Sequence, residues 1–214
     1  MSKISLKHSG GNVVSLNSPT NAPGSADVAF KLPNTDGSAG QVLQTDGNGN
    51  LSWTSVSGSP ITVVNTWRIS SAEKHEGTNA VITSDWEEND TTGYGKIGTS
   101  LTNNSGVFSF PAPGMYYIIS HWRFLIGTAA DSSANVSMEI TTDGTNFSYA
   151  NIMTVGDGGG SYRQHASGDF FFDVTNIQTH KIRFSTHSMA GNSRLLGDSN
   201  ENSSYFTAIR LGDT

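Results

Sequence analysis

The sequence predicts an all-β protein, in which an extended N-terminal arm with β-hairpins precedes a two-sheet sandwich. Short runs of β-branched and aromatic residues alternate with clusters of Gly, Asn, Asp and Ser along the chain, which is the pattern of strands joined by turns. Few windows show apolar residues at the i, i+3 and i+4 spacing of a helix. The composition agrees with this prediction, because 24 of the 214 residues are Gly and only 14% are charged.

Residues 1–60 are expected to form the arm. Their apolar fragments are too short to build a core, and turn clusters separate them. Such a segment buries too little apolar surface to offset the entropy lost on ordering. We therefore expect it to order against itself in an oligomer or against a partner. The Ser-Gly-Ser-Pro sequence at 57–60 predicts a linker, and the second domain is expected to span 61–214.

Residues 40–53 predict a β-hairpin within the arm. A strand with Val42 and Leu43 precedes a tight Asp-Gly or Asn-Gly turn, and a strand with Leu51 and Trp53 follows it. The ordered Gly-Gln-Val-Leu, Asp-Gly and Leu-x-Trp pieces resemble a small module near the N-termini of bacteriophage fibre and other virion structural proteins. This resemblance implies attachment to a virion, with these four apolar residues as the expected contacts.

The Asp-Gly-Asn-Gly-Asn sequence at 46–50 also resembles the start of a calcium loop. An EF-hand loop needs Gly at its sixth position and Glu at its twelfth, where this chain has Leu51 and Ser57. A structural hairpin is therefore expected here, and no metal site.

Residues 61–214 predict the strands of the sandwich. The expected strands are 61–69, 80–82, 93–99, 106–110, 115–126, 134–141, 148–155, 168–174, 179–186 and 204–211. Loops are expected at 143–144, 157–160 and 192–202. Strands at this spacing are typical of a sandwich or jelly roll.

The sequence Gly-Val-Phe-Ser-Phe-Pro-Ala-Pro-Gly-Met-Tyr-Tyr at 106–117 predicts two strands joined by a sharp turn. Pro fixes φ near −65° and Gly accepts a positive φ. The strand that leaves the turn is apolar on both faces, because Tyr116 and Trp122 alternate with Tyr117 and Ile119. A half-solvated antiparallel strand would alternate apolar with polar residues. We therefore expect the second sheet to cover one face of this strand and a copy of the chain to cover the other.

The same twelve residues resemble the G-x-F-x-x-P-x-x-G-x-Y core signature of the complement C1q/tumour-necrosis-factor-like jelly roll. Residues 94–99 lie where that family has the strand that enters the signature, and 193–197 with 204–211 are similar to its closing strand. The resemblance implies a compact homotrimer, with aromatic residues of one sheet packed around a threefold axis. The residues expected in the trimer interface or core are Phe108, Phe110, Tyr116, Tyr117, Ile119, Trp122 and Phe206.

Composition argues against several classes of function. The net charge of −6, without a Lys/Arg cluster, argues against a nucleic-acid partner. No apolar run reaches the roughly 18–20 residues of a membrane span, and residues 1–11 lack the apolar region of a secretory signal. The chain has no Cys, and its six His never show the spacing of metal ligands. We therefore predict no cofactor, no metal site, no catalytic residue, no membrane insertion and no enzymatic activity.

Two groups of residues are candidates for recognition. The aromatic residues Trp86, Tyr149 and Tyr162 lie next to Gly- and Asn-rich loops, where they could contact a carbohydrate receptor or cover an end of the jelly roll. The acidic residues beside Trp86 could bind a cation or a sugar, although a solvated loop is the expected interpretation; they are Asp85, Glu87, Glu88 and Asp90. His121 is expected in the core or interface, where it could confer pH sensitivity.

These features together predict a trimeric structural protein of a bacteriophage virion, such as a tail fibre, a spike or a head/tail appendage. Residues 1–60 would dock to other virion proteins, and the knob at 61–214 would bind a host-surface glycan or protein with the avidity of threefold repetition. The protein would be made in the host cytoplasm and would be located in the virion. Two alternatives stay open, a capsid or tail decoration protein that never touches the host and a depolymerase that cleaves surface polysaccharide.

Overall fold

The computed structural model describes residues 3–7, 9–11, 13–17, 29–55, 61–74, 79–127, 133–156, 162–189 and 193–214. These residues form no helix, so none of them offers a helix that could span a membrane. The chain divides into two compact units, Met1–Gly58 and Ser59–Thr214, and each is described by itself. The linker expected at 57–60 lies outside the described residues.

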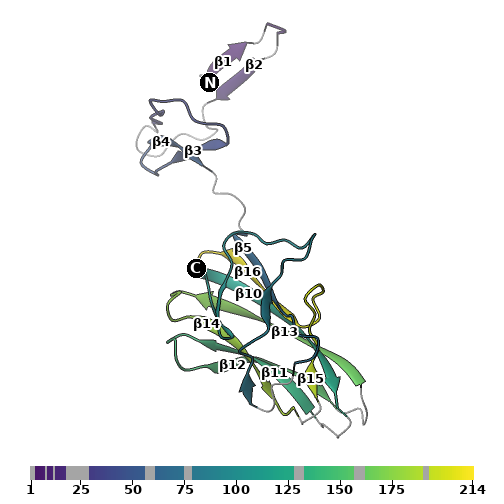
Figure 1. The fold of residues 1–214 in the computed structure, drawn as a ribbon. Coiled ribbons are helices and arrows are strands. Elements are labelled where there is room, and N and C mark those ends of the chain that lie inside the picture. The colour runs from purple at the N-terminus through teal and green to yellow at the C-terminus, as the bar shows by residue number, and fades with distance from the viewer. Residues whose placement is uncertain are drawn as a thin grey trace. The chain divides into compact units, whose positions relative to one another are not determined.

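The first unit contains two antiparallel hairpins (Figure 1). In one, β1 (Lys3–Lys7) pairs with β2 (Val13–Asn17), and in the other β3 (Gln41–Thr45) pairs with β4 (Leu51–Ser55). The hairpin expected at 40–53 is therefore confirmed, but its loop takes in 46–50 rather than a tight two-residue turn. The Asp46 carboxylate organises this loop, because its Oδ1 accepts hydrogen bonds from the backbone N–H of Asn48 at 2.8 Å and of Asn50 at 3.1 Å.

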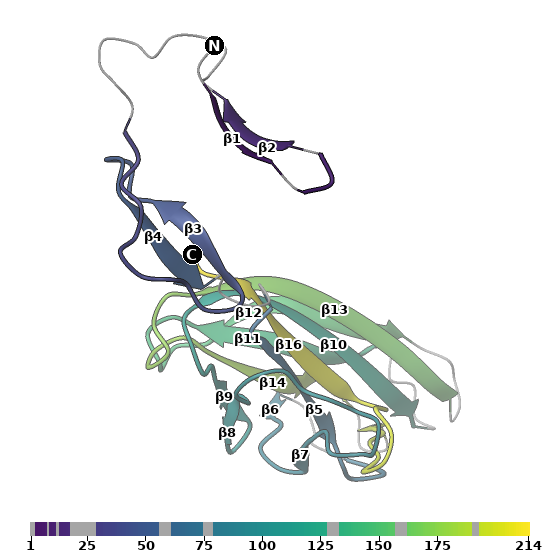
Figure 2. The same cartoon turned by 90° about the horizontal axis from the view of Figure 1, so that it is seen from above.

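The second unit is a sandwich of two six-stranded sheets (Figures 1 and 2). The β10 sheet contains β5 (Val63–Ile69), β7 (Trp86–Glu88), β10 (Gly114–Ile126), β13 (Tyr162–Val174), β15 (Arg194–Leu195) and β16 (Tyr205–Gly212). The β11 sheet contains β6 (Ala80–Val81), β8 (Thr102–Asn104), β9 (Val107–Ser109), β11 (Ser133–Thr141), β12 (Ser148–Gly156) and β14 (Lys181–His187).

All pairings within the two sheets are antiparallel. The β10 sheet has the order β13-β10-β16-β5-β7, with β15 paired to β10. The β11 sheet has the order β12-β11-β14-β9-β8, with β6 paired to β14. The all-β sandwich predicted from the sequence is therefore confirmed.

Three of the strand predictions are corrected. The expected strand at 93–99 contributes only an isolated bridge from Ile97 to Val64. Residues Trp86–Glu88, expected in a solvated loop, form β7, because their backbone and side chains both bond to β5. β13 begins at Tyr162 rather than at residue 168. Its first residues are polar, since this edge strand keeps one face in solvent.

The core between the sheets is rich in aromatic rings. Six of them have no exposed surface, and four of these six, Phe108, Trp122, Phe184 and Phe206, surround Trp86. The ring of Trp86 contacts all four at centroid distances of 5.0 to 6.1 Å, and its Nε1 donates a hydrogen bond to the Ile82 carbonyl at 2.8 Å. The expectation that Trp86 is an exposed receptor contact is therefore wrong. β7 turns this ring inward, where it covers the core as the alternative interpretation had it.

The turn of the 106–117 signature is held by side chains from both sides. The Tyr116 hydroxyl donates to the Ala112 carbonyl at 2.9 Å, and Arg210 Nε donates to the Pro113 carbonyl at 2.7 Å. Gly106 has φ +81°, and a Cβ there would lie 2.0 Å from the Ile82 carbonyl oxygen. Gly114 has φ +141°, and its Cβ would lie 2.4 Å from the Gly212 carbonyl oxygen. Both positions combine an unusual φ with a close backbone contact, and both conditions favour Gly.

Candidate functional site

β10 alternates between the core and the outward face of its sheet. Tyr116 and Trp122 point inward and are fully buried, whereas Tyr117 and Ile119 point outward and are half-buried. Of the residues expected in the trimer interface or core, five lie in the core of the single chain: Phe108, Phe110, Tyr116, Trp122 and Phe206. Only Tyr117 and Ile119 of that set lie where a second chain could reach them.

A row of apolar side chains crosses the outward face of the β10 sheet. The register pairs Phe171 with Tyr117, Tyr117 with Ile209, Ile209 with Val64, and Val64 with Ile97. Directly paired residues share a face of the sheet, so these five side chains form one line, called here the apolar row. Its two ends are the most accessible, with Phe171 60% and Ile97 47% exposed.

Polar pairs lie on the same face beside the apolar row. Thr66 and Thr207 share a hydrogen bond of 2.8 Å between their hydroxyl oxygens. His121 stacks on the Tyr205 ring at a centroid distance of 5.0 Å. His121 is thus at the surface of this sheet rather than in the core, and it borders a shallow cavity of about 320 Å³. That cavity is lined by His121, Arg123, His165, Glu201, Asn202, Ser203 and Tyr205.

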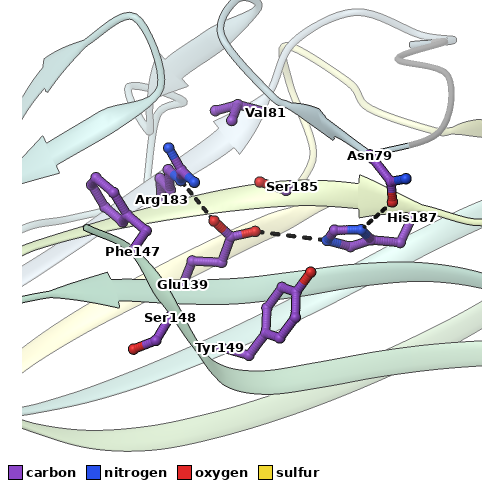
Figure 3. Close-up of a pocket in the computed structure, with 9 residues that line it drawn as sticks. All are labelled: Asn79, Val81, Glu139, Phe147, Ser148, Tyr149, Arg183, Ser185 and His187. Carbon is purple, nitrogen blue, oxygen red and sulfur yellow. Dashed lines mark hydrogen bonds and ion pairs between the residues drawn. The ribbon is translucent and has the colours of Figure 1, made fainter. Parts of the chain in front are cut away.

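The outward face of the β11 sheet carries a larger pocket, of about 560 Å³ (Figure 3). Strand register builds it, because Tyr149 on β12 pairs with Glu139 on β11, and Glu139 pairs with Arg183 on β14. The full lining is Asn79, Val81, Glu139, Phe147, Ser148, Tyr149, Arg183, Ser185 and His187. We call it the β11-sheet pocket.

Glu139 is the buried centre of this pocket. Its Oε2 accepts a hydrogen bond from Arg183 Nε at 2.7 Å, and its Oε1 accepts one from the Ser137 hydroxyl at 2.9 Å. Burial raises the pKa of Glu139, but hydrogen bonds from Arg183 and Ser137 outweigh this effect and hold the pKa below its ordinary value. The carboxylate is therefore charged at neutral pH, and Arg183 neutralises it.

The side chains around Glu139 are held by their neighbours. The Arg183 guanidinium lies over the Phe147 ring at 4.0 Å, which is a cation–π contact. His187 contacts Asn79 Oδ1 through Nδ1 at 2.7 Å and Ser137 Oγ through Nε2 at 2.8 Å. The Tyr149 ring meets His187 edge-on at 5.4 Å, yet Tyr149 remains 59% exposed. Figure 3 shows the hydrogen bond from Arg183 to Glu139 and the line of polar contacts that runs on to His187 and Asn79.

The remaining predicted residues lie on open surface. Tyr162, at the start of β13, is 54% exposed and outside both cavities. In the first unit Val42 is 45%, Leu43 is 43% and Trp53 is 39% exposed, whereas Leu51 is half-buried. The acidic run beside Trp86 is engaged with cations, since Glu87 pairs with Arg68 and Glu88 with Lys96. Among the residues that the structure describes, no group of three or more His, Asp or Glu is arranged to hold a metal ion.

Sequence reasoning found Tyr149 but missed Glu139, Arg183 and His187. These residues come from strands far apart in the sequence, and no spacing motif joins them. One signal was present on β14, where Arg183, Ser185 and His187 alternate with the buried Ile182 and Phe184. Such alternation indicates a polar outward face, although it does not show that the face is hollow.

Comparisons with known proteins identify the fold and do not identify a function. No protein-family model and no curated protein matches the chain. The structure is similar to that of Eiger TNF from S. frugiperda, with a TM-score of 0.56 and 7% identity over 73% of this chain and 96% of the other. It is also similar to murine APRIL at pH 5.0, with a TM-score of 0.51 and 10% identity over 70% of this chain and 98% of the other. The jelly-roll fold is therefore TNF-like, as the 106–117 signature predicted.

Proposed function

We propose that the chain is a structural protein of a bacteriophage virion, such as a tail fibre, a spike or a head/tail appendage, and that it assembles as a homotrimer. In this proposal the N-terminal unit attaches the protein to other virion proteins, and the jelly roll contacts the host surface. The observation that carries the proposal is the apolar row across the outward face of the β10 sheet.

The apolar row has the character of an interface core. A contiguous apolar surface on a folded domain marks a site of protein contact, and the flanking Thr66–Thr207 and His121–Tyr205 pairs would form its polar rim. The row ends in an aromatic ring, Phe171, at one side and in an aliphatic residue, Ile97, at the other. Its two ends therefore differ, which suits an interface in which two different surfaces of neighbouring copies meet head to tail. Contacts of this kind can close into a ring. The C1q/TNF-like resemblance favours three copies in that ring.

The N-terminal unit supports attachment to a partner. Among its described residues, five large apolar side chains are exposed, namely Phe30, Leu32, Val42, Leu43 and Trp53. Trp53 is also anchored, because its Nε1 donates a hydrogen bond to the Thr35 carbonyl at 2.9 Å. A small unit with this much exposed apolar surface gains stability when a partner covers it.

The β11-sheet pocket favours binding over polysaccharide cleavage. Glycoside hydrolysis commonly requires two carboxyl groups that flank the bond to be broken. Glu139 is the one carboxylate among the nine residues that line this pocket, and it is held in an ion pair with Arg183. The depolymerase alternative therefore gains no support from this site.

The mass of the full-length protein in solution tests the homotrimer. The chain has a mass of 22.7 kDa, so light scattering coupled to size exclusion should give about three times that value. Phe171→Asp places a charge at the open end of the apolar row and should yield monomers. Ile152→Asp changes another exposed apolar residue, 49% exposed, on β12 of the other sheet, and should leave the trimer intact. A monomeric wild type, or identical behaviour of the two variants, would refute the interface.

Incorporation into particles tests the arm. Leu43→Asp should leave the trimer mass unchanged but reduce the amount of protein recovered in purified virions, because it charges the exposed face of the β3–β4 hairpin. Particles without the protein should then adsorb more slowly to host cells. Normal adsorption of such particles would instead favour the decoration alternative.

A further inference from the structure

We propose that the β11-sheet pocket binds a single neutral sugar unit of a host-surface glycan, with the sugar ring stacked on Tyr149. The role of this glycan as a host receptor rests on the proposed function, whereas the chemistry of the pocket stands on the residues themselves. The sugar hydroxyls would bond to Arg183, Asn79 and Ser148.

The pocket stays open when the chain assembles as proposed. Glu139, Arg183 and Tyr149 lie on the outward face of the β11 sheet, because they alternate with the buried Met138, Ile182 and Phe184. The apolar row lies on the outward face of the other sheet. The two surfaces are therefore separated by the core of the sandwich, and covering one leaves the other in solvent.

The charges of the pocket select a neutral ligand. Glu139 and Arg183 form an ion pair of 2.7 Å, with side chains 6% and 28% exposed. An anionic sugar at the terminal nitrogens of Arg183 would meet a cation whose charge Glu139 already neutralises, and a cation would meet the Arg183 charge beside Glu139. A ligand without charge keeps this pair intact and avoids leaving a buried charge without its partner.

The polar groups that remain suit hydroxyls. Within the described part of the chain, the two terminal nitrogens of Arg183 have no hydrogen-bond partner, so they are available as donors at the pocket. Asn79 uses Oδ1 to bond His187, which leaves its amide nitrogen as a further donor. Ser148 adds a hydroxyl that can donate or accept. Sugar hydroxyls also do both, so they can match a site that mixes these groups.

The shape of the pocket fits a ring with an apolar face. Its volume of about 560 Å³ lies within the roughly 300–1,000 Å³ of small-molecule sites. Tyr149 offers an exposed aromatic face on which the C–H face of a sugar can lie. His187 contacts this ring at 5.4 Å, and Phe147 holds Arg183 at 4.0 Å. Both binding groups are thus positioned before the ligand arrives, which lowers the entropic cost of binding.

Saturation-transfer NMR and titration of the full-length protein test this assignment. The probes are glucose, galactose, mannose and N-acetylglucosamine, with N-acetylneuraminic acid and inorganic phosphate as anionic probes. We expect at least one neutral sugar to bind and both anions to fail. Tyr149→Ala should weaken the sugar by about tenfold because the stacking is lost, and Tyr149→Phe should restore most of the affinity. Tyr162→Ala, which removes an exposed tyrosine outside the pocket, should change nothing.

The outcomes separate this inference from the proposed function. Light scattering on the same samples reports the oligomeric state. A trimer that binds none of the neutral sugars would refute sugar binding at the β11-sheet pocket and would leave the homotrimer proposal intact. A monomer that binds sugar through Tyr149 supports the pocket and overturns the trimer. Binding of N-acetylneuraminic acid or phosphate in preference to the neutral sugars overturns the assignment, as does binding that Tyr149→Ala does not alter.

Discussion

Arg68 and Glu87 form an ion pair in which Nε lies 2.9 Å from Oε2 and the Arg68 side chain has no exposed surface. The same guanidinium donates to Asn89 and Thr91 through Nη1 at 2.9 Å each, and to Asp90 and the Ser199 carbonyl through Nη2. Arg68 therefore ties two loops to β5. Glu87 and Asp90 of the acidic run thus serve the fold through this cation. The expectation of a solvated loop is wrong for Glu87 and Glu88, which lie in β7, whereas Asp85 and Asp90 are exposed outside it.

Removing this guanidinium should destabilise the jelly roll. Arg68→Met keeps most of the side-chain volume but removes every one of these hydrogen bonds. Breaking a fully buried pair costs about 3–5 kcal/mol, and we expect about 2 kcal/mol here, because Glu87 and Asp90 are 30% and 75% exposed and can be hydrated. Urea unfolding followed by tryptophan fluorescence measures the change. The matched control is Lys96→Met at the exposed Lys96–Glu88 pair, which should cost less than about 1 kcal/mol.

Truncating Trp86 should be more costly. Its ring contacts four buried aromatic rings, and its Nε1 satisfies the Ile82 carbonyl. Trp86→Ala should lower the free energy of unfolding by about 3–5 kcal/mol through the cavity that it leaves. Thermal unfolding measured by circular dichroism reports this loss. Tyr94→Ala removes a ring that is 45% exposed and should change stability by no more than about 0.5 kcal/mol. Equal losses in the two variants would contradict the core position of Trp86.

The signature Gly106 should not tolerate a side chain. Gly106→Ala would bring Cβ within 2.0 Å of the Ile82 carbonyl oxygen at a φ of +81°, so the backbone must shift. We expect a loss of at least about 2 kcal/mol, read from the urea midpoint. Gly95→Ala is the matched control, since a Cβ at Gly95 meets nothing within 4 Å. A variant at 106 as stable as the variant at 95 would show that this backbone contact is not close.

Acid should weaken the fold in part through Glu139. The pKa of this carboxyl is held below its ordinary value of 4.5, chiefly by Arg183 against the opposing effect of burial. A group with a lowered pKa in the folded state contributes its full stability above the unfolded pKa and loses it as the pH falls through the folded pKa. The urea midpoint should therefore fall below about pH 4.5. In Glu139→Gln part of this dependence should be absent. An unchanged pH profile in that variant would show that Glu139 does not contribute to the loss of stability in acid.

The sequence predicted local features better than the meeting of distant strands. The strands that carry Phe108 and Trp122, and the turn between them, follow from apolar runs and from Pro and Gly chemistry. β7 was missed because the Trp86–Glu88 segment is short and acidic, and its pairing with β5 and its contact with the buried Arg68 are made by residues far away in the sequence. The β11-sheet pocket was missed because strand register brings its residues together, and register is a property of the whole sheet.

The alternation along β14 has a consequence for how this protein can vary. Arg183, Ser185 and His187 line the pocket, while Ile182, Phe184 and Thr186, which alternate with them, are fully buried. Residues that contact the proposed ligand and residues that form the core thus alternate along one strand. Substitutions at the outward positions can change which sugar the pocket binds, while the inward core residues stay the same. Ligand recognition can therefore evolve faster than the fold.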